Sequence, residues 1–378
     1  MNGVCETNKM EIMIRSLGDE LGPFKVLWIR QPDVSLEAFV VVDNVACGPA
    51  IGGIRMAIDV TVGEVARLAR AMTLKNAAAG LPHGGGKAGI VANPSLPSAR
   101  KEQLVRAFAH SIRELTEYIP GPDMGLNEEC MAWIKDEIGR VVGLPKVLGG
   151  IPLDEIGATG FGLAISAEVA AERASLDLHG ARVVIQGFGA VGMHAARFLA
   201  ERGGKLVAAS DRQGAIFNAD GLSVEKLTAH KRSGRPLQDF SGAVSMSGDD
   251  LIGLDCDIWI PAARPDVLNE KNVSRLKASL VLQGANIPAT SGAEQWMHEN
   301  GILNVPDFIA NAGGVICASV EYHGGTQSQA MAAIEDRIRA NTSEVLKRAE
   351  EAKCTPRQAA VGIARSRVEE AMRYRRYR

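Results

Sequence analysis

The sequence has few of the features that mark metal-binding, disulfide-bonded or membrane proteins. Its six cysteines include no pair at the close spacing of a zinc or redox motif, and its seven histidines are scattered. We therefore expect no bound metal, and reduced thiols in a cytoplasmic protein are the simplest account of the cysteines. The apolar runs are far shorter than a membrane span, and Met1–Arg15 contains no signal-peptide core.

A surplus of charge of either sign is also missing. The formal net charge is −2 at pH 7, so nothing in it suggests nucleic acid or a membrane surface as a partner. Apolar residues make up 46% of the chain and charged residues 23%, as in ordinary globular proteins. A length of 378 residues is too great for one ordinary domain and suits two.

The most distinctive stretch that is present is glycine-rich and covers residues 81–89, where three consecutive glycines precede Lys87. Such glycines allow a tight turn or a close approach of the backbone to a ligand. A phosphate-binding loop is excluded, because that motif needs glycine where Leu81 stands and Ser or Thr where Ala88 stands. We expect a glycine-rich turn that directs Lys87 into a cleft.

A helix is predicted to precede this turn. Thr61 and Glu64 have the spacing of a capping box, which places the helix start at Thr61. An apolar face then recurs at helical spacing, and it includes Met72 and Lys75. Because a buried unpaired ammonium is costly, Lys75 is paired, or it awaits an anionic ligand, or it lies at the margin and extends to water.

Local patterns predict further elements of a first domain. β-rich runs at 25–29 and 38–42 read as strands, and a helix near 101–117 has one apolar face. The prolines and glycine of residues 120–122 cannot continue that helix. Asp123 therefore lies in a loop before the next helix, which Asn127 could cap.

The second half contains a dinucleotide-binding βαβ unit. A strand at 181–186 leads into a glycine-rich turn at 187–192, a helix over 190–202, and a second strand that ends at Ser210-Asp211. The first glycines allow a tight turn and the approach of a pyrophosphate to the helix N-terminus, and the last allows helix–strand packing. Apolar runs at 256–262 and 279–285 predict further strands of a covered parallel sheet.

Several separate blocks of the sequence occur in an order that is specific to one family. The blocks are Gly48-Pro49-Ala50-Ile51-Gly52-Gly53-Ile54-Arg55, Lys75-Asn76-Ala77-Ala78, Gly84-Gly85-Gly86-Lys87, Pro122-Asp123-Met124-Gly125, Ala158-Thr159-Gly160 and Asn311-Ala312-Gly313-Gly314-Val315. Together they resemble the Glu/Leu/Phe/Val amino-acid dehydrogenase family.

The resemblance implies an α/β fold of two domains and a homo-oligomer. An N-terminal α/β domain for substrate binding and oligomerisation is expected at 1–150, joined by C-terminal helices within 328–378. A Rossmann dinucleotide-binding domain is expected at 151–327. The shift to Gly, Pro and Leu over 143–162 fits a crossing between the two.

The expected cofactor is NAD, with NADP as the alternative. An acid at the end of the second strand binds the ribose 2′-hydroxyl of NAD, whereas an adjacent arginine can accept the 2′-phosphate of NADP. Asp211 and Arg212 offer both, and Asp211 would repel a phosphate unless it turns away. From the motif and the resemblance, the cofactor-binding residues are Thr159, Gly187, Phe188, Gly189, Ala190, Val191, Gly192, Ser210, Asp211, Arg212, Ala262, Ala263, Gly284, Asn286 and Asn311.

A nicotinamide cofactor beside two lysines and an aspartate suggests oxidation at a carbon that bears an amine. The reaction needs a cation for the α-carboxylate and a base for the amine, and a lysine serves as base only when desolvation or a nearby cation lowers its pKa. The resemblance implies that Lys75 binds the substrate carboxylate, Lys87 is the catalytic lysine and Asp123 is the catalytic acid/base. Taken alone, Asp123 could simply form a turn.

The substrate pocket resembles the leucine/valine branch of the family. Where the glutamate branch has a lysine, a glutamine and a serine, this chain has Ile51, Met72 and Ala318, which would leave a side-chain carboxylate unpaired. With Gly52 also in the site, we expect an apolar L-α-amino acid to be converted to its 2-oxo acid and ammonia, and the reverse. Because residues 122–128 look more like the glutamate branch, glutamate dehydrogenase is one alternative, and a non-catalytic nucleotide-binding regulatory homologue is another.

Overall fold

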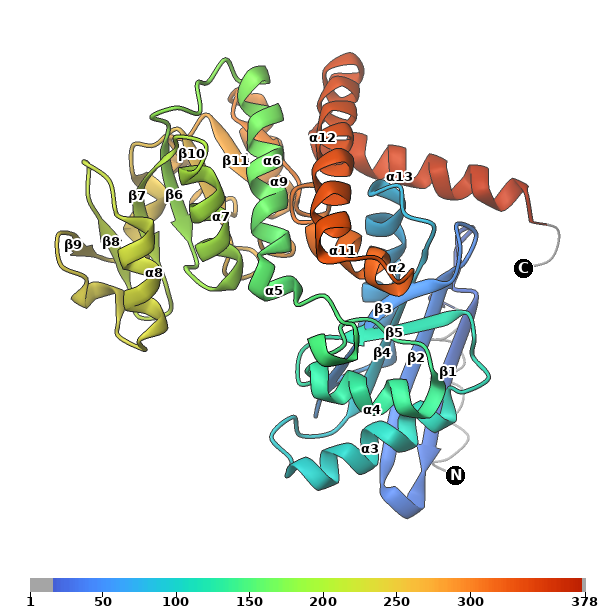
Figure 1. Cartoon of the computed structure of the whole chain (residues 1–378). Coiled ribbons are helices and arrows are strands. Elements are labelled where there is room, and N and C mark those ends of the chain that lie inside the picture. The colour runs from blue at the N-terminus through green and yellow to red at the C-terminus, as the bar shows by residue number, and fades with distance from the viewer. Residues whose placement is uncertain (1–15, 376–378) are drawn as a thin grey trace, which may run out of the picture. The chain divides into compact units, whose positions relative to one another are not determined.

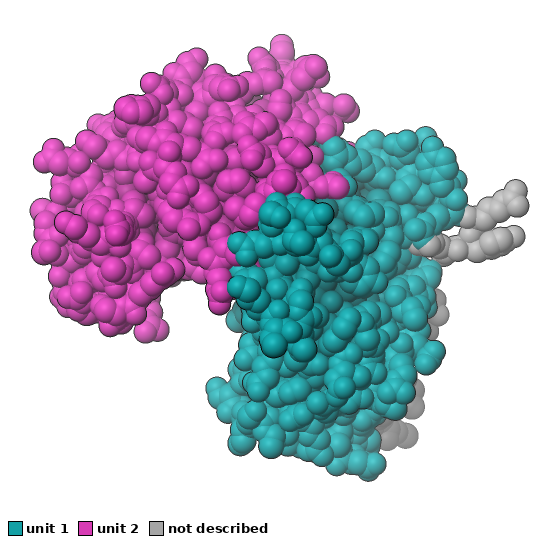
Figure 2. Space-filling view, in the orientation of Figure 1, with its two compact units in different colours: residues 1–152, 318–329, 363–378 teal, residues 153–317, 330–362 magenta. Residues whose placement is uncertain are grey.

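The computed structural model describes residues 16–375 and divides the chain into two compact units (Figure 2). Unit 1 comprises residues 1–152, 318–329 and 363–378, and unit 2 comprises residues 153–317 and 330–362. The expectation that Met1–Arg15 contains no signal peptide lies outside the described residues. Among residues 16–375, none of the helices has both the length and the apolar character needed to cross a membrane.

Unit 1 is built on a five-stranded sheet of order β1-β2-β4-β3-β5 (Figure 1). Its strands are β1 Lys25–Gln31, β2 Leu36–Asn44, β3 Ala50–Ala57, β4 Gly84–Val91 and β5 Tyr118–Pro122. β2 pairs antiparallel with β1 and β4, while β3 pairs parallel with β4 and β5. The strands predicted at 25–29 and 38–42 are confirmed, whereas β3 and β5 lie in stretches for which no strand was predicted.

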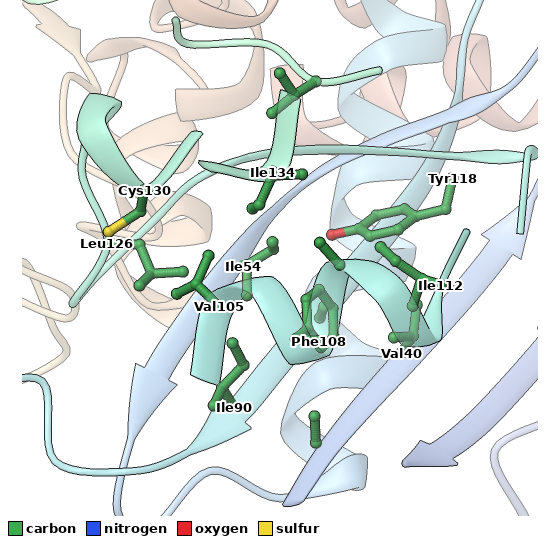
Figure 3. Packing of buried hydrophobic residues seen from close by; sticks show 14 of the residues in the cluster. Val40, Ile54, Ile90, Val105, Phe108, Ile112, Tyr118, Leu126, Cys130 and Ile134 are labelled. Carbon is green, nitrogen blue, oxygen red and sulfur yellow. The ribbon is translucent and has the colours of Figure 1, made fainter. Parts of the chain in front are cut away.

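Different helices cover the two faces of this sheet. Alternate residues of a strand point to opposite faces, so Val41 of β2 packs with α2 (Val62–Ala78) while Val40 belongs to the core on the other side. That core is filled by α3 (Ser98–Ser111) and α4 (Glu128–Ile138), as Figure 3 shows for Val105, Phe108 and Ile134. As predicted, Asn127 caps α4, since its side chain accepts a hydrogen bond from the Cys130 amide at 3.2 Å.

The three glycines before Lys87 form the start of strand β4, so the predicted turn is wrong. None of them adopts a positive φ. The close packing of neighbouring residues explains these glycines instead. A Cβ on Gly85 would lie 2.0 Å from the Thr73 amide nitrogen of α2, and one on Gly86 would lie 2.8 Å from the Tyr118 ring. The glycines allow the helix and a neighbouring ring to approach the strand closely.

Helix α2 starts where the capping box placed it, because the Thr61 side chain accepts a hydrogen bond from the Glu64 amide. Its buried face is nevertheless rotated from the predicted one. The residues of α2 that are buried are Val62, Val65, Ala69, Thr73, Asn76, Ala77 and Ala78. Met72 and Lys75 are half-buried. The prediction that Lys75 lies on the apolar face is therefore wrong, and the lysine lies at its margin.

Unit 2 contains a seven-stranded sheet of order β12-β11-β10-β6-β7-β8-β9 (Figure 1). Its strands are β6 Arg182–Gln186, β7 Lys205–Ser210, β8 Ala215–Phe217, β9 Val244–Met246, β10 Ile258–Pro261, β11 Leu280–Leu282 and β12 Leu303–Val305. The first five in the order run parallel, and β8 and β9 form an antiparallel edge. The predicted parallel strands are confirmed, while the antiparallel edge was not foreseen.

The chain closes with two long helices, α12 (Gln327–Ala352) and α13 (Pro356–Arg373), close to the predicted positions. Residues 330–362 group with unit 2 and residues 363–378 with unit 1. The sequence patterns placed all of 328–378 with the first domain, and the functional domain boundaries stay a prediction.

Candidate active site

A buried lysine–aspartate pair lies on the sheet of unit 1. Lys87 projects from β4, and Asp123 directly follows β5. The Lys87 Nζ atom lies 2.5 Å from Asp123 Oδ2, and the two side chains are only 10% and 20% exposed. The sheet order places β3 between their two strands. Lys87 therefore reaches Asp123 across one intervening strand.

Glycine in β3 makes this reach possible. The register sets Ile54 beside Ala88 on one side, so Gly53 lies level with Lys87. A Cβ on Gly53 would lie 2.9 Å from the Asp123 Cβ and 2.6 Å from the Pro122 carbonyl oxygen. Any larger residue would displace the aspartate, and this is the physical reason for glycine at position 53.

Arg55 is a second cation at this site, and the sequence analysis missed it. Its Nε lies 3.5 Å from Asp123 Oδ2, and its guanidinium also pairs with Glu64. Burial works to raise the pKa of Asp123, but the charges of Lys87 and Arg55 hold that pKa below its ordinary value. Arg55 is two residues beyond Gly53 and thus on the same face of β3, a period-two signal that could have identified it.

The structure shows the surroundings of the two lysines that the sequence singled out. Lys87 lies against a carboxylate, so Asp123 is a proton acceptor within direct reach of Lys87 Nζ. Lys75 lies in the last turn of α2 and is half-buried. These side chains can hold an anion and pass a proton between a lysine and an aspartate.

An apolar cluster in unit 1 contains two of the expected substrate residues. Ile51, Ile119 and Val142 are buried together, and Ala318 and Tyr322 of α11 (Gly313–Tyr322) pack against them. The structure therefore brings Ile51 and Ala318 together, while Met72 is half-buried on α2 and is not a member of this cluster.

The backbone beside this cluster is also held in place. The carbonyl of Gly52 accepts a hydrogen bond of 2.7 Å from the Tyr118 hydroxyl. His83, which the sequence analysis missed, packs edge-on against Tyr322 and donates from Nδ1 to the Pro49 carbonyl at 3.2 Å. Burial lowers the pKa of His83 to about 4, so this ring is neutral at physiological pH. No spacing pattern in the sequence marks it.

In unit 2 the glycine-rich turn after β6 leads into α7 (Ala190–Ala200). Gly187 has φ +100, and its amide donates to the Ser210 carbonyl at 3.0 Å. Gly189 occupies the N-cap without a side-chain cap, so the first amides of α7 have no side-chain acceptor there. A Cβ on Gly192 would lie 2.1 Å from the Gly187 oxygen. This cradle fits the pyrophosphate of a dinucleotide.

The remaining turn residues divide into backbone and helix positions. Phe188 is fully buried, so only its backbone is available to a ligand. Ala190 and Val191 begin α7. Thr159 lies in the first turn of α6 (Ala158–Arg173). A Cβ on Gly314 would lie 3.5 Å from the Thr159 hydroxyl oxygen, which is ordinary contact.

The carboxyl edge of the same sheet gathers several of the residues expected to bind the nicotinamide cofactor. Asn311 Nδ2 donates to the carbonyls of Gly284 and Ala285, both at 3.3 Å, and lies 3.2 Å from Asn286 Oδ1. A Cβ on Gly284 would lie 3.3 Å from the Ala262 Cβ. Ala263 follows as an exposed residue. Ligands of open parallel sheets bind at this kind of edge.

Asp211 is already paired. Its side chain, 8% exposed, forms an ion pair with Lys231 and accepts a hydrogen bond from the Gln213 amide at 2.8 Å. Burial works to raise the pKa of Asp211, but the bond from Lys231 keeps that pKa below its ordinary value. Arg212 is exposed beside it. No local sequence signal predicts that Lys231 neutralises the Asp211 carboxylate.

A parallel sheet with a glycine-rich strand–helix turn, and a second unit with a buried lysine–aspartate pair, define a two-domain dinucleotide-dependent α/β enzyme. The Glu/Leu/Phe/Val dehydrogenase dimerisation domain matches residues 24–140. The Glutamate/Leucine/Phenylalanine/Valine dehydrogenase family matches residues 149–376. The chain therefore belongs to this family and is an NAD(P)-dependent amino-acid dehydrogenase, an oxidoreductase that acts on CH–NH2 groups.

Relatives with different substrates are similar over nearly the whole chain. A glutamate dehydrogenase of Aeropyrum pernix is 38% identical and covers 88% of this chain and 85% of its own. The hetero-hexameric glutamate dehydrogenase of Thermus thermophilus, in its leucine-bound form, is 31% identical with a TM-score of 0.83, over 94% and 91% of the two chains. The L-tryptophan dehydrogenase of Nostoc punctiforme is 27% identical with a TM-score of 0.75, over 96% and 99%.

Proposed function

We propose that the protein catalyses the NAD(P)-linked oxidative deamination of an apolar L-α-amino acid to its 2-oxo acid and ammonia, and the reverse reaction. The observation that carries this proposal is the apolar cluster around Ile51, where Ala318 and Tyr322 pack. An ionised side-chain carboxylate placed in such surroundings without a partner would cost more than the roughly 2–7 kcal/mol of an unpaired neutral polar group.

The residues of unit 1 have separate roles in this proposal. Lys75 holds the substrate carboxylate by charge. Lys87 Nζ, next to Asp123 Oδ2, takes a proton from the amine and later activates water on the imine, and Asp123 relays that proton. A nicotinamide dinucleotide held by unit 2 would supply the hydride acceptor for the reaction. The charge of Lys87, with that of Arg55 beside it, lowers the pKa of Asp123 and so keeps its carboxylate ionised and able to accept a proton.

Glutamate is the second candidate substrate, and the similar proteins favour it more directly than they favour an apolar substrate. Two of the three relatives described above are glutamate dehydrogenases, including the most identical of them. The third acts on tryptophan, so a large uncharged substrate also has a precedent within this fold. Identity below 40% leaves a few pocket residues free to reverse the preference.

We propose NAD as the cofactor. NADP is the second candidate, because Asp211 is paired with Lys231. Asp211 at the end of β7 is the residue type that binds the ribose 2′-hydroxyl of NAD. Its pairing with Lys231 reduces the repulsion that a 2′-phosphate would meet, and Arg212 is exposed beside it. The dinucleotide would rest on Gly187, Gly189 and the first turn of α7.

A substrate panel tests both choices in one experiment. Reduced-cofactor absorbance is followed with glutamate, leucine, valine, phenylalanine and tryptophan, each with NAD and with NADP. We expect an apolar substrate to have at least tenfold higher kcat/KM than glutamate, and the Ile51→Lys/Ala318→Ser double variant to shift the ratio toward glutamate. A preference for glutamate in the wild type would overturn the apolar reading, and no turnover with any amino acid would favour the non-catalytic alternative.

We also propose a homo-oligomer assembled through the first domain. The matched dimerisation domain and the hexameric relative support association, and β1 is an edge strand that assembly could cover. Sedimentation of the purified chain should give a species well above its 40.1 kDa monomer mass at micromolar concentration. A stable monomer would contradict this. A cytoplasmic location remains an expectation from the sequence.

A further inference from the structure

The first turn of α13 contributes a half-buried cation, Arg357, to the sheet edge of unit 2. Arg357 Nε lies 2.6 Å from Glu294 Oε2. Its terminal nitrogen lies 2.8 Å from Asp307 Oδ1 and donates to Gln283 Oε1 at 2.9 Å. Burial disfavours this charge, but the two carboxylates outweigh it and raise the pKa of Arg357. One guanidinium thus connects three segments of the unit.

Asp307 passes this connection to the expected nicotinamide loop. While Oδ1 faces Arg357, Oδ2 accepts a hydrogen bond of 2.7 Å from the Ile287 amide. The Asp307 carbonyl accepts one of 2.7 Å from the Asn311 amide. Asp307 therefore holds the loop that contains Gly284 and Asn286 through its side chain, and it holds Asn311 through its backbone carbonyl.

The loop needs such support because its backbone is strained. Ile287 is a β-branched residue with φ +49, a conformation that costs about 1–3 kcal/mol unless its surroundings hold it. The Ile287 amide is fixed by Asp307, and Asn311 Nδ2 holds the neighbouring carbonyls of Gly284 and Ala285. The position of Asn286 thus depends on Asp307 keeping its orientation.

We propose that Arg357 is a positioning residue for the dinucleotide site, which fixes the Gly284–Ile287 loop and Asn311 by orienting Asp307. The inference rests on the proposed function, in which Gly284, Asn286 and Asn311 bind the dinucleotide. Arg357 contacts Glu294, Asp307 and Gln283, the residue directly before the loop, so its effect on the cofactor is transmitted through the Asp307 carboxylate and Gln283.

Arg182 is a matched control in the same unit. It also pairs with two carboxylates, Asp255 at 2.9 Å and Asp257 at 2.8 Å, but it begins β6 at the amino end of the strand, away from the carboxyl edge. Replacing either arginine by methionine removes a two-carboxylate ion pair and keeps the aliphatic stem. Only Arg357 is connected to the expected cofactor loop.

The test compares full-length wild type with Arg357→Met, Arg357→Lys and Arg182→Met. NADH and NADPH affinities are measured by fluorescence titration, and the KM for the dinucleotide and kcat by steady-state assay. We expect Arg357→Met to weaken the preferred dinucleotide at least tenfold and to raise its KM similarly, with kcat at saturation within about threefold. Arg357→Lys should recover part of the affinity because it keeps the charge but loses the planar fork. Arg182→Met should stay within twofold.

The alternatives give distinct results. Equal affinities of Arg357→Met and Arg182→Met, at comparable losses of melting temperature, would reduce Arg357 to a structural residue and overturn the inference. If Arg357→Met does not fold, Asp307→Asn carries the test and must weaken binding by a similar factor. A wild-type chain that binds neither dinucleotide would overturn the proposed function and this inference with it, whereas normal wild-type binding with unaffected variants would overturn the inference alone.

Discussion

The candidate site of unit 1 is built from side chains, whereas the candidate site of unit 2 is built mainly from backbone. In unit 1 the site consists of charged side chains, Lys87 and Asp123, that meet across a strand whose glycine leaves room for them. In unit 2 the site consists mainly of backbone, where Gly187 turns with φ +100 and the uncapped N-terminus of α7 offers its amides. One site depends on two functional groups, whereas the other depends on a backbone path.

This difference sets how each site should respond to mutation. Removing a single ammonium from unit 1 eliminates a group that no neighbour replaces, so the loss should appear in kcat. Adding a methyl group to the backbone cradle of unit 2 displaces a ligand by a fraction of an ångström, so the loss should appear in cofactor affinity. The three predictions below test this division, from the largest expected effect to the smallest.

Lys87→Ala should lower kcat by at least about 10³-fold, or about 4 kcal/mol in activation free energy, because the proposed proton acceptor is removed. Dinucleotide affinity should stay within about threefold, since Gly187 and α7 belong to the other unit. Steady-state assays and NADH fluorescence titration measure the two quantities. Lys25→Ala is the matched control. Lys25 lies on β1, an edge strand of the same sheet, and it also pairs with a carboxylate, that of Glu117. Retention of more than a tenth of wild-type kcat would refute the role of Lys87.

The same division explains what could be predicted from the sequence. The backbone motif of unit 2 was predictable because glycine spacing and flanking apolar runs are local signals, and β6, α7 and β7 formed where expected. The site of unit 1 depends on the pairing of β4, β3 and β5, which are distant in sequence. Gly84–Gly86 were predicted to form a turn, but they begin strand β4. The position of Arg55 beside Asp123 follows from the strand register, which the sequence alone does not reveal.

Charge pairing in unit 2 was unpredictable for a similar reason. Asp211 and Lys231 are twenty positions apart, and only the return of α8 (Val224–Arg232) brings them together. The buried face of α2 was also misjudged, because alanine, threonine and asparagine pack against β4 where larger apolar residues were expected. Tertiary contact, rather than hydrophobicity, selected that face.

Gly187→Ala should weaken dinucleotide binding about 10- to 100-fold while kcat at saturating cofactor changes little. The added Cβ would lie 2.8 Å from Ala262 and Ala263, in a conformation that disfavours any side chain. Gly234→Ala is the matched control, since Gly234 has φ +79 in the same unit but open space around its Cβ position. Both variants should lose some stability, yet only Gly187→Ala should lose affinity. Equal affinities in the two variants would show that the cradle tolerates displacement.

The smallest expected effect concerns the acid stability that the unit 1 pair confers. The pKa of Asp123 in the folded protein lies below its ordinary value of 3.8. The ionised carboxylate therefore stabilises the fold fully above the unfolded pKa, and this contribution is lost as the pH falls through the folded pKa. In Asp123→Asn, which cannot ionise, the deficit in unfolding free energy relative to wild type should be constant above about pH 5 and should narrow below about pH 4. Urea unfolding from pH 3 to pH 7 measures this deficit.

Asp211→Asn provides the comparison from unit 2, because Asp211 also pairs with a lysine and also has a lowered pKa. Both deficits should narrow in acid, but only Asp123→Asn should also reduce kcat at pH 7 when the dinucleotide is saturating, because Asp211 is proposed to act on cofactor affinity. A deficit for Asp123→Asn that stays unchanged down to pH 3 would show that the ion pair with Lys87 does not stabilise the folded protein.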